Sequence, residues 1–163
     1  MNGLEAVWTA TAMLWVAAAA WMDWRRRRVW WAWFILGGLA AGVYRLIHWL
    51  NNGFAFDQLL LIAAVILAAF QLWRARVWGG ADAKTAMVLI LVSPDWRMVL
   101  VLALVDVAVV AGWVLARQGL EGLSRFGGRI RSVLRGEALE RSETIPLVAV
   151  MAVGYGGYIL LFG

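Results

Sequence analysis

The chain has 163 residues, a net charge of +5, 64% hydrophobic residues and no cysteine. Soluble domains are closer to half apolar, so this excess of apolar residues indicates a protein embedded in lipid. The lack of cysteine excludes disulfides, thiolate metal sites and cysteine nucleophiles, and the single histidine, His48, cannot build a histidine-rich metal site. We therefore expect neither a metal nor another cofactor.

Six apolar segments follow one another and predict an all-α membrane protein with a single domain over residues 1–163. A membrane-spanning helix needs about 20 apolar residues. The fourth segment reaches that length only if it begins near Gly79 and continues toward Trp96. The segments are expected at 4–22, 29–50, 58–73, 83–92, 98–116 and 145–162.

Most of the basic residues, which are all arginine except Lys84, lie in alternate breaks between the apolar segments. The breaks at 23–28, 74–84 and 117–144 hold most of the positive charge, whereas those at 51–57 and 93–97 hold one arginine between them. Since positive loops stay in the cytoplasm, this alternation predicts six transmembrane helices with both termini on the outer side. It also predicts contact with anionic lipids, and it leaves no soluble segment long enough to bind nucleic acid.

The first segment resembles a cleaved signal peptide because its alanines offer a cleavage site, but the arginines follow the apolar run instead of preceding it. We expect a retained helix. The last cytoplasmic loop, 118–143, has apolar residues at helical spacing between arginines and is expected to lie on the inner leaflet, interrupted at Gly127–Gly128. A basic solvated linker is the alternative. Gly38 and Gly42 predict close packing of the second helix against another.

The predicted topology sorts the five aspartates by depth. Asp57 and Asp95 fall in the outer loops, where a solvated carboxylate is expected. Asp106 lies in the middle of the fifth helix and must face protein instead of lipid. Asp23 ends the first helix and Asp82 begins the fourth, so both are expected at the cytoplasmic edge of the membrane although they are far apart in sequence.

Two carboxylates at one depth, partly withdrawn from water, are suited to aspartic-type hydrolysis. One ionised group takes a proton from water while the protonated partner donates to the substrate carbonyl. A helix N-terminus favours Asp82 as the anion and a C-terminus favours Asp23 as the acid, although the arginines after Asp23 favour the opposite assignment. Two structural alternatives stand beside this one: Asp23 pairs with Arg26 or Arg27, and Asp82 caps its helix.

The residues around these aspartates resemble motifs of the type IV prepilin peptidase family, membrane aspartic peptidases that include the preflagellin peptidases. That family has G-x-G-D-x-K at its second aspartate, a basic stretch and Ile-Pro-Asn after its first, and Ile-Pro-Phe at its last helix. The corresponding residues here are Gly79-Gly80-Ala81-Asp82-Ala83-Lys84, Asp23 with Arg25 to Arg28 and Val29, and Ile145-Pro146-Leu147.

The resemblance implies an aspartic endopeptidase of the cytoplasmic membrane that cleaves the basic leader of prepilin-like proteins at the cytoplasmic face. Asp23 and Asp82 would be catalytic, and Gly79, Gly80, Ala81 and Lys84 would support them or bind substrate. The chain is the short form without the cysteine-containing methyltransferase region, so no methylation is expected.

The sequence departs from the family motifs at positions close to both aspartates. Ala81 replaces the second glycine of the motif, and Trp30 and Trp31 replace Pro-Asn. These departures motivate a first alternative function, a catalytically silent family member that serves as a pilus-assembly scaffold. A second alternative is a small proton-coupled transporter that uses Asp106.

Overall fold

The computed structural model describes residues 3–26, 29–75, 78–134 and 147–162. Within these ranges the chain is all-helical, as the sequence predicts. The helices are α1 (Gly3–Arg26), α2 (Trp31–Asn52), α3 (Phe56–Arg74), α4 (Gly80–Val92), α5 (Trp96–Leu134) and α6 (Leu147–Phe162).

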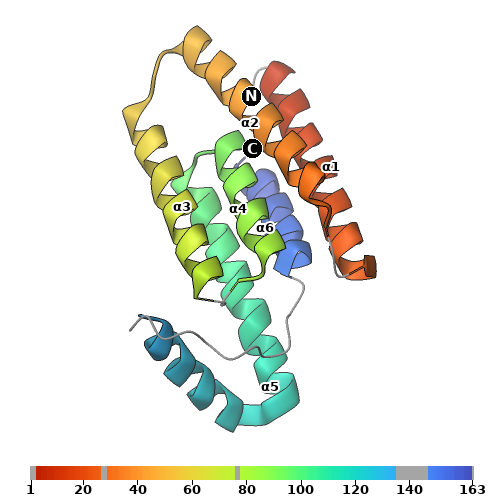
Figure 1. The fold of residues 1–163 in the computed structure, drawn as a ribbon, viewed down its shortest axis with the longest axis vertical. Helices are drawn as coiled ribbons and strands as arrows, with labels where there is room; N and C mark the ends of the chain where they lie inside the picture. The colour runs from red at the N-terminus through yellow and green to blue at the C-terminus, as the bar shows by residue number, and fades with distance from the viewer. Residues whose placement is uncertain (1–2, 27–28, 76–77, 135–146, 163) are drawn as a thin grey trace.

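Successive helices run in alternating directions along the long axis of the molecule (Figure 1). The start of α1 and the end of α6 consequently lie at the same end of the bundle. The opposite end holds the end of α1 and the starts of α2, α4 and α6.

Helix α4 is the centre of the bundle and packs against α1, α2, α3 and α6. Its side chains are buried along most of its length. Small residues in its first two turns, Ala83, Thr85 and Ala86, let the neighbouring helices approach, and Leu89 and Ile90 fill the core beyond them. With 13 residues it is the shortest of the described helices.

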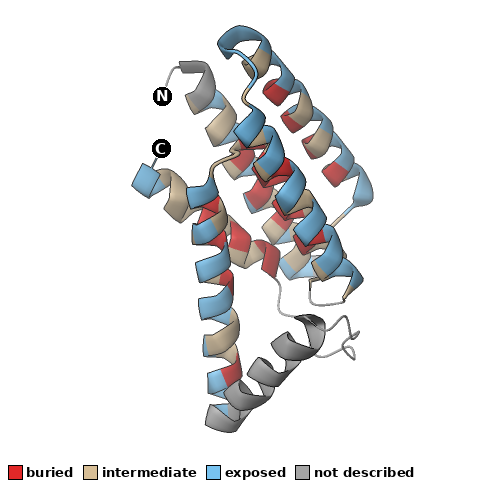
Figure 2. Ribbon diagram, turned by 90° about the vertical axis from the view of Figure 1, so that its left-hand side faces the viewer, coloured by how far each residue is buried: buried red, intermediate tan, exposed pale blue. Residues whose placement is uncertain are grey.

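The outer faces of the bundle are apolar. Figure 2 shows exposed residues along the outward sides of the helices and buried residues toward the interior. Large exposed side chains include Leu36 on α2, Leu60 on α3 and Leu104 on α5. An apolar exterior over an interior of the same character is typical of a protein surrounded by lipid tails.

In the described part of the chain, three helices are long and apolar enough to cross a membrane, namely Trp31–Asn52, Phe56–Arg74 and Trp96–Ala116. They correspond to the second, third and fifth apolar segments of the sequence. Helices α4 and α6 are shorter. The chain is therefore a helical membrane protein with at least these candidate spans.

Helix α5 changes direction at Gly119 and not at Gly127–Gly128 as expected. Gly119 has φ 64° and ψ −161°, a conformation that glycine adopts without the steric penalty of a side chain. Beyond it the second part of α5 leaves the bundle axis (Figure 1). Gly127 and Gly128 stay helical, because glycine permits such a break without enforcing one.

The side chain of Trp15 on α1 packs on α2 one position away from the predicted pair of glycines. A Cβ placed on Gly38 or Gly42 would meet no atom within 4 Å, whereas one on Gly37 would lie 2.5 Å from Cε2 of Trp15. Ala41, one turn beyond Gly37, is 2% exposed. Gly37 is therefore the glycine on which the Trp15 side chain packs, and the prediction of close packing through Gly38 and Gly42 was wrong.

Candidate functional site

Asp23 and Asp82 lie at the same end of the bundle. Asp23 is in the last turn of α1 and Asp82 is in the first turn of α4, and these two helices pack against each other. The carboxyl groups are close enough to interact electrostatically. The fold thus brings together two acids that are separated by more than 50 residues of sequence.

Asp82 is held by backbone groups. Its Oδ2 accepts a hydrogen bond from the N–H of Gly79 at 2.9 Å, and the backbone N–H of Val148 at the start of α6 lies near the same carboxyl. Asp82 therefore caps α4, which was the structural alternative. Capping uses only part of the hydrogen-bond acceptor capacity of Asp82, since a carboxylate has two oxygens with about four acceptor positions. The side chain is only 5% exposed, so water or substrate reaches it only if neighbouring elements move.

The two glycines before Asp82 have different surroundings. Gly79 is the N-cap residue of α4, and a Cβ there would lie 2.8 Å from Oδ2 of Asp82. A Cβ on Gly80 would instead lie 3.6 Å from Nε1 of Trp73, an ordinary contact distance. Gly79 therefore needs to be glycine for the carboxylate to hold its position, and Gly80 does not.

The other residues of the motif, Ala81 and Lys84, are not under such a steric constraint. Ala81 is helical, and its carbonyl accepts a hydrogen bond from Oγ1 of Thr85 at 2.9 Å. Alanine thus fits this position without positive φ. The Nζ of Lys84 lies 5.4 Å from the centre of the Phe34 ring on α2, a cation–π distance. Lys84 therefore contacts the start of α2.

The two tryptophans that replace Pro-Asn lie on the surface. Trp30 caps α2 with an extended backbone and Trp31 begins it. Both are more than 60% exposed. Exposed tryptophan is common at the boundary between lipid and water. Because both side chains are largely exposed, neither is packed over the aspartates.

Asp106 is a third carboxyl group near the pair. It is 8% exposed, in agreement with the expectation that it faces protein, and it interacts electrostatically with Asp82. Among the residues that the structure describes, its Oδ1 has no hydrogen-bond partner. The sequence singled out Asp106 by its place within an apolar helix but gave no sign of its proximity to Asp82.

The outer-loop aspartates differ from each other. Asp57 is exposed, as expected. Asp95 is partly buried, and its carboxylate accepts the hydroxyl of Tyr158 at 2.9 Å and the backbone N–H of Arg97 at 2.9 Å. It is therefore a structural group at the start of α5 instead of a purely solvated one.

A polar pocket that the sequence did not indicate lies at the end of the bundle opposite Asp82. It is lined in part by Arg45, which is 5% exposed within α2. The available signal was an arginine inside the second apolar segment, because a charge at such a position is costly unless it has a function or a partner.

Part of the predicted site falls outside the described residues. This applies to the Ile145-Pro146 pair of the third motif. Within the described ranges, no three His, Cys, Asp or Glu side chains form a group that could hold a metal ion.

Comparison with known proteins gives no assignment: no protein-family model, curated protein or solved structure matches the chain. The arguments for a function therefore rest on its own residues and on the motifs that they resemble.

Proposed function

We propose that the chain is an aspartic endopeptidase of the cytoplasmic membrane that removes the basic leader of prepilin-like proteins. The observation that carries the proposal is the electrostatic proximity of Asp23 and Asp82 at one end of the bundle. The motifs around both residues point to the same reaction. The arginine distribution supports six spans, with both termini outside and the aspartates facing the cytoplasm.

The pair would work as a single titrating unit with one shared proton. Two carboxyls that interact in a site shielded from water are unfavourable when both are ionised. The ionised group would take a proton from a water molecule as the water attacks the scissile carbonyl. The protonated group would donate its proton to the carbonyl oxygen.

Access to the pair would require an opening beside α6. The N–H of Val148 lies near the carboxyl of Asp82, and Val148 itself is 0% exposed. Displacing the start of α6 would uncover the carboxyl between α1, α4 and α6. The basic leader of a substrate could then enter from the end of the bundle, while the apolar helix that follows the leader enters from the lipid side.

The test is co-expression with a candidate prepilin and measurement of its size on a gel. We expect Asp23→Asn and Asp82→Asn each to reduce cleavage at least 100-fold, because neither single carboxyl can both accept and donate the proton. Asp57→Asn, which makes the same change at an exposed site, should cleave normally. Full cleavage by both single variants would contradict the proposal.

A second candidate function, proton-coupled transport, is favoured by Asp106. Its buried carboxyl has an unpartnered oxygen among the described residues and interacts with Asp82, an arrangement that proton relays in membranes use. Under this function Asp106→Asn abolishes activity while Asp23→Asn is tolerated. The peptidase predicts that Asp23→Asn is the inactive variant, so this variant separates the two functions.

A further inference from the structure

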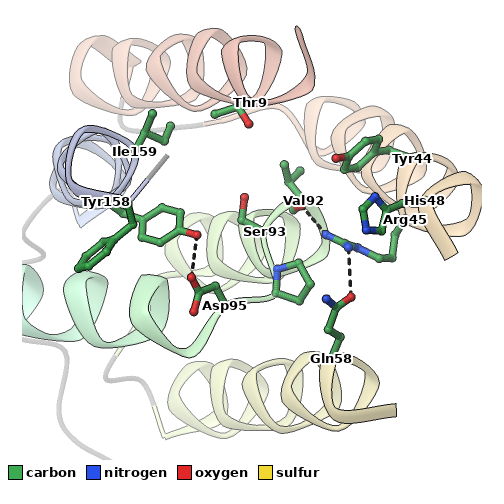
Figure 3. A pocket seen from close by; sticks show the side chains of 12 residues that line it. Thr9, Tyr44, Arg45, His48, Gln58, Val92, Ser93, Asp95, Tyr158 and Ile159 are labelled. Atoms are coloured by element: carbon green, nitrogen blue, oxygen red, sulfur yellow. Dashed lines mark hydrogen bonds between the residues drawn. The ribbon is translucent and has the colours of Figure 1, made fainter. Parts of the chain in front are cut away.

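The pocket at the end of the bundle opposite Asp82 has a volume of about 330 Å³. It lies where α4 ends, and its walls come from α1, α2, α3, the α4–α5 connection and α6 (Figure 3). Polar side chains from separate helices reach it, with apolar residues such as Val92 and Ile159 among them.

Among the residues that the structure describes, Arg45 is the only positively charged side chain that lines this pocket. Its Nε donates to the carbonyl of Leu91 at 3.0 Å, its Nη2 to the carbonyl of Val92, and its Nη1 to Oε1 of Gln58 at 3.3 Å. These acceptors are neutral oxygens. In the described part of the chain, therefore, the charge is offset by the carbonyl end of α4, which is equivalent to about half an elementary charge.

The pocket has hydrogen-bond donors that the hydrogen bonds among the described side chains do not use. A guanidinium has five N–H groups, and three are engaged here. Oε1 of Gln58 accepts from both Arg45 and Nε1 of Trp49, the latter at 3.2 Å, so the amide N–H groups of Gln58 remain to face a ligand. The hydroxyl of Thr9 on α1 reaches the same pocket.

Within the described ranges, Asp95 is the only carboxylate on the pocket wall. It lies near Tyr158, away from Arg45 (Figure 3), and it already accepts the hydroxyl of Tyr158 and the N–H of Arg97. Asp95 consequently does not neutralise Arg45. The buried cation, the surplus donors and the free volume together fit an anionic ligand.

We propose that this pocket binds a phosphate-type anion, either the headgroup of an anionic phospholipid or free phosphate. Donors from α1, α2 and α3 surround the space from different directions, which suits the tetrahedral oxygens of phosphate better than a planar carboxylate. The volume exceeds that of one water molecule many times over. The site is independent of the aspartate pair, and its failure would leave the peptidase proposal untouched.

The test uses the purified full chain with two probes. Native mass spectrometry compares retention of phosphatidylglycerol with that of phosphatidylcholine, and calorimetry measures inorganic phosphate. Gln58→Glu keeps the oxygen that accepts from Arg45 and Trp49 but replaces the free amide with a negative charge. We expect it to weaken binding at least tenfold. Asn51→Asp adds the same charge at an exposed position outside the pocket and should bind as wild type.

Thr9→Val removes one donor without a change of charge and should weaken binding several-fold, which keeps the proposal testable if Gln58→Glu does not fold. If these variants lose binding of phosphatidylglycerol alone, the pocket is a site for the lipid headgroup. If they lose binding of inorganic phosphate, the pocket is a site for the free anion. Either result supports the proposal. It is overturned if the wild type binds neither probe, or if Gln58→Glu and Thr9→Val bind like Asn51→Asp.

Discussion

At the scale of single residues, Asp82 on α4 interacts electrostatically with two acids on other helices, Asp23 on α1 and Asp106 on α5. Asp23, Asp82 and Asp106 stand out because charges are rare in apolar segments. That Asp106 interacts with Asp82 depends on how α5 is rotated, and no local pattern determines this rotation. The pocket around Arg45 was missed for a related reason, because its donors come from helices whose pairing the sequence does not encode locally.

The hydrogen bond from the N–H of Gly79 to the carboxylate of Asp82 predicts unequal effects of alanine substitutions at Gly79 and Gly80. Gly79→Ala places a methyl group 2.8 Å from Oδ2 of Asp82, so the carboxylate must move away from the N–H that it accepts. We expect prepilin cleavage to fall at least tenfold. Gly80→Ala, whose new methyl group meets Trp73 at an ordinary distance, should retain activity within about twofold. Equal activity in the two alanine variants would contradict this role for Gly79.

At the scale of helices, the apolar segments predicted every helix within a few residues of its ends, apart from the extension of α5 beyond residue 116. Hydrophobic length is read directly from sequence, so this success has a simple cause. Packing faces are harder to predict. Gly37 and Gly38 are adjacent and chemically identical, and only the rotation of α2 against α1 decides which one contacts Trp15.

The contact between Gly37 and Trp15 predicts unequal effects for two neighbouring substitutions. Gly37→Ala forces the indole ring of Trp15 to move, because the new methyl group would lie 2.5 Å from it. Overpacking of this kind typically costs about 1–3 kcal/mol of folding free energy. Gly38→Ala meets no atom within 4 Å and improves helix propensity, so it should be neutral or stabilising.

Thermal unfolding in detergent, followed by loss of the monodisperse peak in size-exclusion chromatography, measures both variants. We expect the midpoint of Gly37→Ala to fall below that of wild type and the midpoint of Gly38→Ala to match or exceed it. The reverse order would mean that α1 and α2 pack through the other face of α2.

At the scale of the whole molecule, the alternating helices place the two ends of the bundle far apart. The α2–α3 connection lies at one end, and the end of α3 lies at the other (Figure 1). The arginine distribution assigns the end of α3 to the cytoplasm. The sequence could predict the alternating directions of the helices, because the basic residues fall mainly in every second break between apolar segments. It could not predict that α4 lies in the centre of the bundle.

Because the chain has no cysteine, single cysteines can report this topology without background. We expect Asn51→Cys to react with a membrane-impermeant maleimide in intact cells, since it lies at the end predicted to be outside. Ala75→Cys, which keeps every arginine, should react only after the membrane is permeabilised. Labelling of both positions in intact cells would contradict the proposed orientation.

The shortness of α4 has an electrical consequence. Thirteen residues rise about 20 Å, whereas the hydrocarbon core is about 30 Å thick. Since α4 is enclosed by other helices, this deficit does not have to be met by thinning the bilayer. If water fills the space beyond each terminus, the insulating layer at the centre of the molecule is thinner than the surrounding membrane, and the resting voltage falls across a shorter distance. Asp82, at one boundary of that layer, would then experience a steeper field than a group at the same depth in lipid.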